Sequence, residues 1–325
     1  MPFSLDTIIH YFPEAVQRLV HEPRVTDIMM MGERIFVEER GQKRRVDASI
    51  DAFDLRTVIN YIAVQCEDAI NEQSPILDGR LPDGSRVNAV IQPIAFGGDT
   101  LTIRKFGGWF SIEELIACGT VPQVVVDYLR TAIDEGGNIV LSGATGSGKT
   151  TVLNGLISLV PADQRLIVIE KPAELQIKHE CVVRWTPRKG QREGDRTITW
   201  SDLIEAALRS NPDRIILGEI RDQAAYDLIQ ALNTGHGGSM STTHANSCQD
   251  ALERLSDMAL SARSNLNQEF IRRSVARSIN YVVQVKKEQG HRQVTEMVKI
   301  TGYAQDSFQV ERLYMKGAKA AYAYS

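Results

Sequence analysis

The sequence predicts an α/β fold, in which a mostly parallel sheet with covering helices follows a smaller α+β domain. A glycine-rich loop at residues 143–150 lies between a short apolar strand pattern and a helical pattern. From residue 112 onward, helical and strand patterns alternate, which is typical of a parallel sheet. We therefore predict an α+β N-terminal domain over residues 1–106, a linker over 107–111 and an α/β domain over 112–325.

The N-terminal domain is expected to combine short strands with one longer helix. Pro13 indicates the start of a short helix before residue 21. Residues 25–46 predict strands interrupted at Gly32 and Gly41, residues 78–94 predict turns leading into a strand, and residues 100–106 predict another strand. A helix over residues 55–70 is expected to bury Val58, Ile59, Ile62, Cys66 and Ile70 on one face.

The second domain is expected to alternate helices with strands along its length. Its helices are predicted at residues 112–118, 122–135, 151–160, 201–209, 222–233, 247–260 and 267–279. Its strands are predicted at residues 138–142, 165–170, 214–219, 238–244, 280–286 and 292–300. Ser201 and Asp222 are expected to cap the helices that follow them, because their side chains accept hydrogen bonds from a first helical turn.

The glycine-rich loop GATGSGKT matches the pattern G-x-x-x-x-G-K-[ST]. Its place between a strand and a helix lets backbone N–H groups and the helix N-terminus surround phosphates. Lys149 is expected to reach the terminal phosphates of ATP, and Thr150 to hold Mg²⁺. The phosphate-binding residues are predicted to be Gly143, Ala144, Thr145, Gly146, Ser147, Gly148, Lys149, Thr150 and Thr151.

Acidic residues and a histidine follow three other predicted strands of this domain. Glu219 is the only carboxylate at its strand end, because Gly218 precedes it. Ligands of α/β folds bind at such ends, so we expect Glu219 to orient or polarise an attacking water, with a capped strand end as the alternative. Glu170 either cooperates in water activation or lies in a surface turn. His244 is expected near the phosphates and His236 in the turn before it; a structural role is the alternative for both.

The composition is that of an ordinary globular chain and excludes several other classes. Hydrophobic residues make up 43%, and no apolar run approaches the roughly 20 residues of a membrane span. The first residues lack a basic leader, so a cytoplasmic location is expected. A net charge of −4 gives no overall basic field, and no direct nucleic-acid binding is expected.

The cysteines and one basic segment are the remaining features with possible chemistry. Cys66, Cys118, Cys181 and Cys248 form no C-x-x-C pair, which argues against a zinc site. They are expected to be small buried side chains in a reducing compartment. Residues 184–196 carry five basic side chains and are either a solvated loop or a mobile loop that touches a polyanion or a neighbouring subunit.

The motif segments occur in an order that is similar to that of one known family. They are LPDGSRVNAVIQP and LTIRKF in the N-terminal domain, followed by GATGSGKTT, IEKPAEL, LRSNPDRIILGEIR and TGHGGSMSTTHANS. These resemble, in that order, the N-domain arginine segments, Walker A loop, acidic box, atypical Walker B motif and histidine box of the VirB11-type secretion ATPases. The similarity is greatest to the TadA/CpaF and TrbB-like branch and runs from about Val25 to the last strands.

The resemblance implies a RecA-like P-loop NTPase domain covered by the small N-terminal domain, within a homo-hexameric ring. Such a ring hydrolyses ATP with Mg²⁺ to drive secretion, conjugation or pilus assembly beside inner-membrane platform proteins. It would be cytoplasmic and peripheral to the inner membrane. The residues carried over as catalytic are Glu219, Glu170, His244, His236, Arg104, Arg86 and Arg221. Of these, the two arginines of the N-terminal domain would reach in to the nucleotide.

Two features depart from the family pattern. Lys171 stands where an aspartate is common, which removes a carboxylate from the acidic box. The first predicted strand begins near Val25, which leaves no room for the long N-terminal extension of many CpaF proteins. A motor ATPase is the leading hypothesis. A nucleotide-binding scaffold with negligible hydrolysis and a RecA-like nucleic-acid motor are the alternatives, the latter with little support from the charge and the 6% aromatic content.

Overall fold

The structure is a computed structural model. It describes residues 9–22, 24–39, 42–66, 68–81, 84–105, 110–171, 173–188, 196–221, 224–233, 235, 237–262 and 266–318. The chain divides into two compact units, Met1–Gly108 and Trp109–Ser325. Each unit has its own sheet and its own buried apolar residues.

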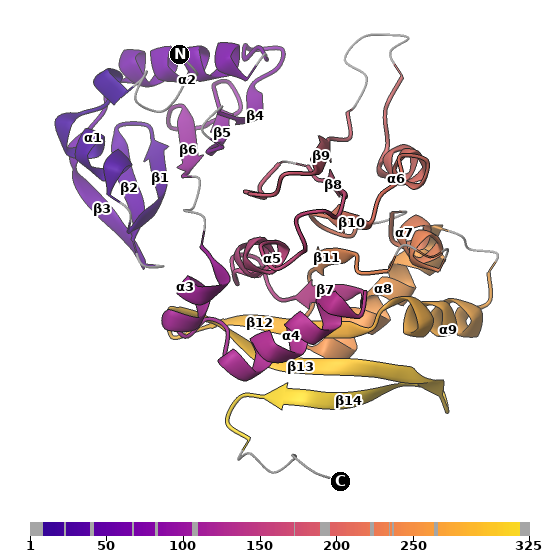
Figure 1. Cartoon of the computed structure of the whole chain (residues 1–325). Helices are drawn as coiled ribbons and strands as arrows, with labels where there is room; N and C mark the ends of the chain where they lie inside the picture. The colour runs from indigo at the N-terminus through magenta and orange to yellow at the C-terminus, as the bar shows by residue number, and fades with distance from the viewer. Residues whose placement is uncertain are drawn as a thin grey trace. The chain divides into compact units, whose positions relative to one another are not determined.

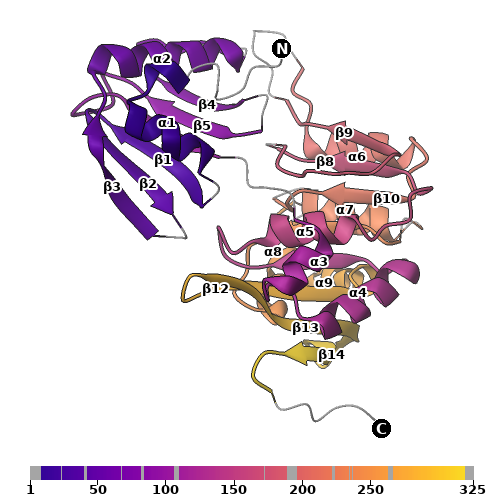
Figure 2. The same ribbon diagram turned by 60° about the vertical axis from the view of Figure 1, so that its left-hand side comes forward.

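The first unit is a six-stranded antiparallel sheet with helices packed against it. Its strands are β1 (Val25–Met31), β2 (Arg34–Glu39), β3 (Gln42–Ser49), β4 (Ile76–Arg80), β5 (Arg86–Val90) and β6 (Thr100–Arg104), in the spatial order β3-β2-β1-β6-β5-β4. The 3-10 helix η2 (Ile9–Tyr11) precedes α1 (Glu14–His21), and α2 (Ala52–Gln65) follows β3. One apolar core joins both α-helices to the strands, and Figure 2 shows the two helices lying against the sheet.

Two sequence predictions for this unit are corrected by the structure. The helix predicted to extend to residue 70 ends at Gln65, so Ile70 packs against the core from outside the helix. The segment around Gly79 was expected to be a turn, but it lies in β4. A Cβ atom at Gly79 would lie 2.5 Å from Cys66 Sγ, so this glycine allows the end of α2 to approach the strand closely.

The second unit is an eight-stranded, mostly parallel sheet between two layers of helices. Its strands are β7 (Ile139–Ser142), β8 (Leu166–Ile169), β9 (Val182–Trp185), β10 (Arg214–Leu217), β11 (Met240–Thr243), β12 (Tyr281–Glu288), β13 (His291–Ala304) and β14 (Ser307–Met315). Their spatial order is β14-β13-β12-β7-β11-β10-β8-β9. The six strands from β12 to β9 are parallel, whereas β13 and β14 pair antiparallel at one edge, where Figure 1 shows them in yellow. The predicted parallel sheet is therefore confirmed.

The helices of this unit divide between two apolar cores. One core contains side chains of α3 (Ile112–Ala117), α4 (Gln123–Asp134) and α5 (Lys149–Ile157). The other contains side chains of α6 (Trp200–Leu208), α7 (Ala224–Leu232), α8 (Cys248–Ala262) and α9 (Gln268–Ser278). Strand side chains alternate between the cores: Val140 and Val282 face the α6–α9 layer, whereas Leu141 and Val283 face the α3–α5 layer.

Several local predictions for the second unit differ from the structure. β9 and β14 were not predicted. Ser201 does not cap α6, because Thr199 and Asp202 form a reciprocal capping box instead. Asp222, the other predicted cap, lies outside the described residues. Of the four cysteines expected to be buried, Cys248 is buried, Cys66 and Cys181 are partly exposed, and Cys118 is exposed in the turn after α3. Across the described residues, no helix combines the length and the apolar character needed to cross a membrane.

Candidate active site

The motif residues of the second unit gather at one edge of its sheet. β7, β8, β10 and β11 are parallel, so their carboxyl ends lie on the same side. The glycine-rich loop follows β7, Glu170 follows β8, Glu219 comes two residues after β10, and His244 follows β11. Residues far apart in the sequence are therefore brought into hydrogen-bonding distance.

The glycine-rich loop is shaped by close approaches that only glycine permits. A Cβ atom at Gly143 would lie 2.2 Å from the carbonyl oxygen of Val285 and 2.6 Å from Ser147 Oγ. Gly148 is the N-cap of α5 and has φ of +101°, in the left-handed region that side chains rarely adopt. The loop therefore curls tightly before α5 begins at Lys149, two residues earlier than predicted.

Lys149 is buried inside this curl. Its Nζ donates to the carbonyl oxygens of Gly143 at 2.7 Å and Ala144 at 2.9 Å, and it lies 3.4 Å from His244 Nδ1. Burial lowers the pKa of Lys149 to about 8, while the carboxylates of Glu219 and Glu174 act in the opposite direction. Lys149 thus remains largely charged at pH 7, but the ammonium is poorly solvated and suited to an anionic ligand.

The loop residues fit a bound phosphate group. Ser147 is 1% exposed, and its hydroxyl has no hydrogen-bonding partner among the described residues. A buried hydroxyl in this state gains from a ligand that accepts a hydrogen bond from it, and phosphate oxygens are strong acceptors. Thr150 and Thr151 are half-buried in the first turn of α5. Thr150 supplies a hydroxyl oxygen of the type that Mg²⁺ takes as a ligand.

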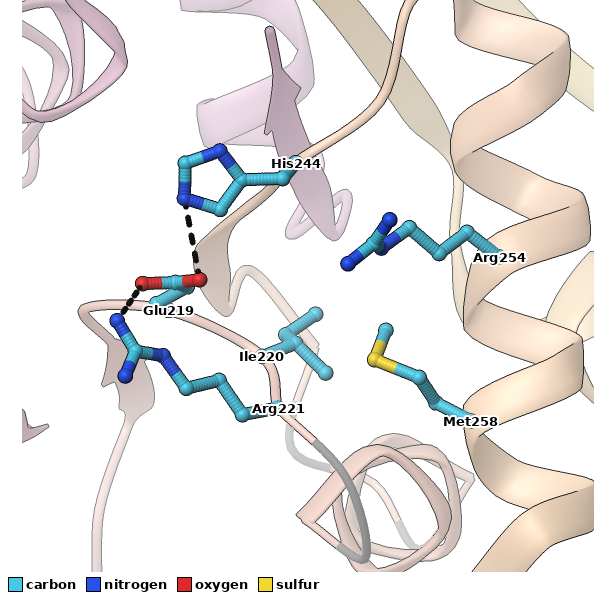
Figure 3. Close-up of a pocket in the computed structure, with 6 residues that line it drawn as sticks. All are labelled: Glu219, Ile220, Arg221, His244, Arg254 and Met258. Carbon is cyan, nitrogen blue, oxygen red and sulfur yellow. Dashed lines mark hydrogen bonds and ion pairs between the residues drawn. The ribbon is translucent and has the colours of Figure 1, made fainter. Parts of the chain in front are cut away.

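Glu219 is held by two neighbours from different segments. Its Oε2 accepts from Arg221 Nη2 at 2.5 Å, and its Oε1 lies 3.2 Å from His244 Nε2 (Figure 3). Because the Lys149 ammonium can only donate, His244 Nδ1 accepts from it and Nε2 carries the proton offered to Glu219. Burial and the charge of Lys149 lower the pKa of His244, so it is neutral near pH 7. Lys149, His244, Glu219 and Arg221 form one connected network.

A pocket of about 240 Å³ lies beside this network. Glu219, Arg221 and His244 line it together with Ile220 and with Arg254 and Met258 of α8. Figure 3 shows Arg254 and Met258 projecting from α8 toward Ile220. The pocket thus places two arginines and a neutral histidine around a carboxylate.

Glu170 occupies a different environment from Glu219. It is 2% exposed, and its oxygens accept from the backbone N–H groups of Glu174 and Leu175 and from Arg184 Nη2 at 2.5 Å. A Cβ atom at Gly218 would lie 2.8 Å from Glu170 Cβ, so that glycine lets the two strand ends approach. Because three donors use its oxygens, this geometry favours a positioning role for Glu170 over activation of water.

Three residues of the site lay outside the sequence-based prediction. Arg184, in the basic segment, is the partner of Glu170 rather than a solvated charge. Arg254 lines the pocket beside Glu219. Arg292 of β13 donates from Nε to the carbonyl oxygen of Gly146 at 3.1 Å. No local pattern marks Arg292, since the β12–β13 hairpin alone brings it back to the loop.

The predicted arginines of the first unit also lie side by side. Arg86 of β5 and Arg104 of β6 are cross-strand partners, and Arg104 pairs in turn with Asp27 of β1. Arg104 Nε donates to Asp27 Oδ1 at 2.8 Å, and Asp27 is 6% exposed. Arg80 continues the row on β4, opposite Arg86. Of the predicted site residues, His236 lies outside the described residues.

Comparison with known proteins decides the family. The model of the family described as "Type II/IV secretion system protein" matches residues 13–310. The chain belongs to this family. It is 32% identical to a conjugal transfer protein, TrbB, of Rhizobium radiobacter, over 88% of this chain and 87% of that protein. It is 30% identical to the type IV secretion system protein VirB11 of Bartonella quintana, over 78% of this chain and 82% of that protein.

These relatives confirm that the chain is a VirB11-type member of the type II/IV secretion family. Among solved structures, the ATPase DotB of Yersinia pseudotuberculosis matches with a TM-score of 0.64 and 18% identity, over 92% of this chain and 80% of that chain. At this identity the likeness concerns the fold, and it agrees with the predicted RecA-like P-loop domain. This member of the secretion family thus has an α/β fold with its motif residues at one edge of the sheet.

Proposed function

We propose that the chain is an ATP-hydrolysing motor of a secretion, conjugation or pilus-assembly system. The observation that carries the proposal is the network in which His244 joins Lys149 of the phosphate loop to Glu219. Hydrolysis of a phosphoanhydride needs a cation that binds phosphate and a carboxylate that acts on the attacking water. Lys149 and Glu219 supply these two groups at the carboxyl ends of the parallel strands. The family membership supports the same function.

In this mechanism Glu219 acts on the attacking water. The water oxygen forms a bond to the γ-phosphorus, the bond to the β–γ bridging oxygen breaks, and ADP leaves as the water's proton passes to Glu219. Lys149 exchanges the carbonyl oxygens of Gly143 and Ala144 for phosphate oxygens. Mg²⁺, held by Thr150, would neutralise phosphate charge. His244 and Arg221 hold the Glu219 carboxylate in place before substrate binds.

The proposal extends to assembly and location on the strength of the family resemblance. We infer a homo-hexameric ring at the cytoplasmic face of the inner membrane, beside platform proteins of the secretion system. We also infer that Arg86 and Arg104 of the first unit contact the nucleotide, because a guanidinium fork binds two phosphate oxygens at once. A contact to the γ-phosphate would then bias domain closure toward the ATP state.

A Glu219→Gln variant tests the mechanism. The amide is nearly isosteric but cannot accept the water's proton, so steady phosphate release should fall by about 10² to 10⁴ while ATP binding persists. Lys149→Ala is the matched variant, in which binding and turnover should fall together. Equal loss of binding and turnover in Glu219→Gln would instead assign Glu219 to the fold or to the metal. If the unmodified protein forms a ring but releases no phosphate from ATP, the result would favour a nucleotide-binding scaffold.

A further inference from the structure

The first unit exposes large apolar side chains at one end of its sheet. Five residues form this set, which we name the apolar end patch: Met31, Phe53, Ile76, Ile94 and Phe96. Their exposed fractions run from 39% for Met31 to 98% for Phe96. A phenylalanine left almost wholly in water forgoes the gain of burial, and several large exposed apolar side chains at one end of a unit are typical of an interaction site.

The strand register places these residues at the same end of the sheet. Met31 pairs with Thr100 and Ile76 pairs with Val90, so both lie at the strand ends from which the β5–β6 loop leaves. That loop carries Ile94 and Phe96. β3 ends on the same side, because its last residue pairs with the first residue of β2, and α2 follows with Phe53 in its first turn.

The β5–β6 loop is anchored rather than loose. Arg56 of α2 binds both carboxylate oxygens of Asp99, at 2.5 and 2.8 Å. Asp99 also accepts from the backbone N–H of Gln92 through its side chain and from that of Gly32 through its carbonyl oxygen. These bonds tie the loop to α2 and to the β1–β2 turn. Phe96 is thus presented on a fixed base, which lowers the ordering cost of binding a partner.

The charges around the apolar end patch are mainly acidic. The exposed carboxylates are Glu33 in the β1–β2 turn, Asp51 and Asp54 on either side of Phe53, and Glu72 before β4. The charge of Glu72 acts on Arg56, which shows that Glu72 lies near this end of the unit. Arg34 is the exposed basic residue at the start of β2. An acidic rim around apolar side chains complements a segment that carries Lys or Arg beside an apolar anchor.

We propose that the apolar end patch docks a Lys- and Arg-rich cytoplasmic segment, with an apolar anchor, of an inner-membrane protein of the secretion system. The proposal rests on the membrane partner of the proposed function. Cytoplasmic loops of membrane proteins carry an excess of Lys and Arg. The same acidic rim opposes anionic lipid headgroups, and it opposes a second copy of itself through like charge.

The apolar end patch lies away from Arg86 and Arg104 of the same unit. Arg86 and Arg104 lie four residues along β5 and β6 from the strand ends that bear the patch. At a rise of about 3.3 Å per residue, the separation is about 13 Å. The docking end and the arginine end are therefore opposite ends of the same strands, so a docked partner and a nucleotide contact do not compete.

Binding of the full chain to inverted inner-membrane vesicles from its own organism tests the proposal. Sedimentation should show that Phe96→Ser weakens binding about 30-fold, as for a hot-spot aromatic. Phe270→Ser, which changes a phenylalanine 52% exposed on α9 of the other unit, is the matched control and should bind normally. Protein-free liposomes of the same lipids should bind poorly. A photo-crosslinking phenylalanine analogue at position 96 should label a basic segment of a membrane protein.

Four results would overturn the proposal. They are equal binding by the Phe96→Ser variant, no vesicle binding by the unmodified chain, equally tight binding to protein-free liposomes, and a cross-link only to a second copy of this chain. ATP turnover measured on the same preparation separates docking from the proposed activity. If the chain docks through Phe96 but hydrolyses no ATP, only the proposed hydrolysis is refuted. If the chain hydrolyses ATP but does not dock through Phe96, only the docking surface is refuted.

Discussion

Raising the pH from 7 to 9 should release nucleotide, because the charge of Lys149 depends on pH in this range. Lys149 is 7% exposed, and burial lowers the pKa of its ammonium to about 8. A bound phosphate favours the charged form, so binding raises that pKa again. Above pH 8, binding must therefore take up a proton. Affinity should be constant below the lowered pKa and should fall as the pH rises through and above it.

The size of the effect follows from the pKa. With a pKa of about 8, only about one Lys149 in eleven is protonated in the free protein at pH 9, so ADP should bind about tenfold more weakly than at pH 7. A lysine at the ordinary value of 10.5 would remain charged at pH 9, and the affinity would barely change. His244 adds nothing in this range, because its lowered pKa keeps it neutral throughout.

Isothermal titration with ADP measures the effect directly. Titrations in buffers with different ionisation heats would also count the protons taken up at pH 9. Lys149→Met is the control: its affinity should be low at every pH and should not change between pH 7 and 9. An unmodified chain that binds ADP equally well at both values would refute the reasoning. So would a Lys149→Met variant that keeps the full pH dependence.

Three further changes have outcomes fixed by single contacts. Gly143→Ala should abolish ADP binding without unfolding the chain, since its methyl group has no room; normal ADP binding in calorimetry would contradict this. Arg292→Gln keeps a donor for the Gly146 carbonyl and should bind ADP within about twofold of the unmodified chain, whereas Arg292→Ala should bind about fivefold more weakly. An equal loss in both would assign the effect to charge. Arg184→Ala leaves Glu170 buried without its cation and should lower the free energy of unfolding by about 2 to 3 kcal/mol in urea titrations, and an unchanged midpoint would show that the two backbone amides suffice.

The fold was largely predictable because hydrophobic periodicity reports which face of each element is buried. β7, β10 and β11 were predicted within two residues. β7 and β10 are short, largely apolar runs between helical patterns, whereas β11 is buried although three of its four residues are Ser or Thr. β14 and β9 were not predicted. β14 is an edge strand with mostly exposed side chains, and β9 is half-buried, so neither shows a strong apolar run. β4 was expected to be a turn because Gly79 suggests one. In the structure Gly79 lies within the strand, where the lack of a side chain allows Cys66 to approach closely.

Local signals also compete where two residues can do the same task. Ser201 was expected to cap α6, but Thr199 begins the helix because Asp202 returns a hydrogen bond to it. A single good capping residue is thus outweighed by a pair that satisfies two backbone groups. Cys118 shows the same limit for burial: the residue type predicts a buried side chain, but its place in a turn after α3 leaves it exposed.

The sequence by itself determined the glycine-rich loop and the order of the motifs, because the tight curl of the loop needs glycines at fixed spacing along one segment. It also determined that Glu219 and His244 lie just after the ends of strands. Only the tertiary structure decided what these residues contact. His244 joins Lys149 to Glu219, and Arg292 reaches the loop from more than 140 residues away. Such contacts depend on strand order and register, which set distances between segments that no local pattern along the chain records.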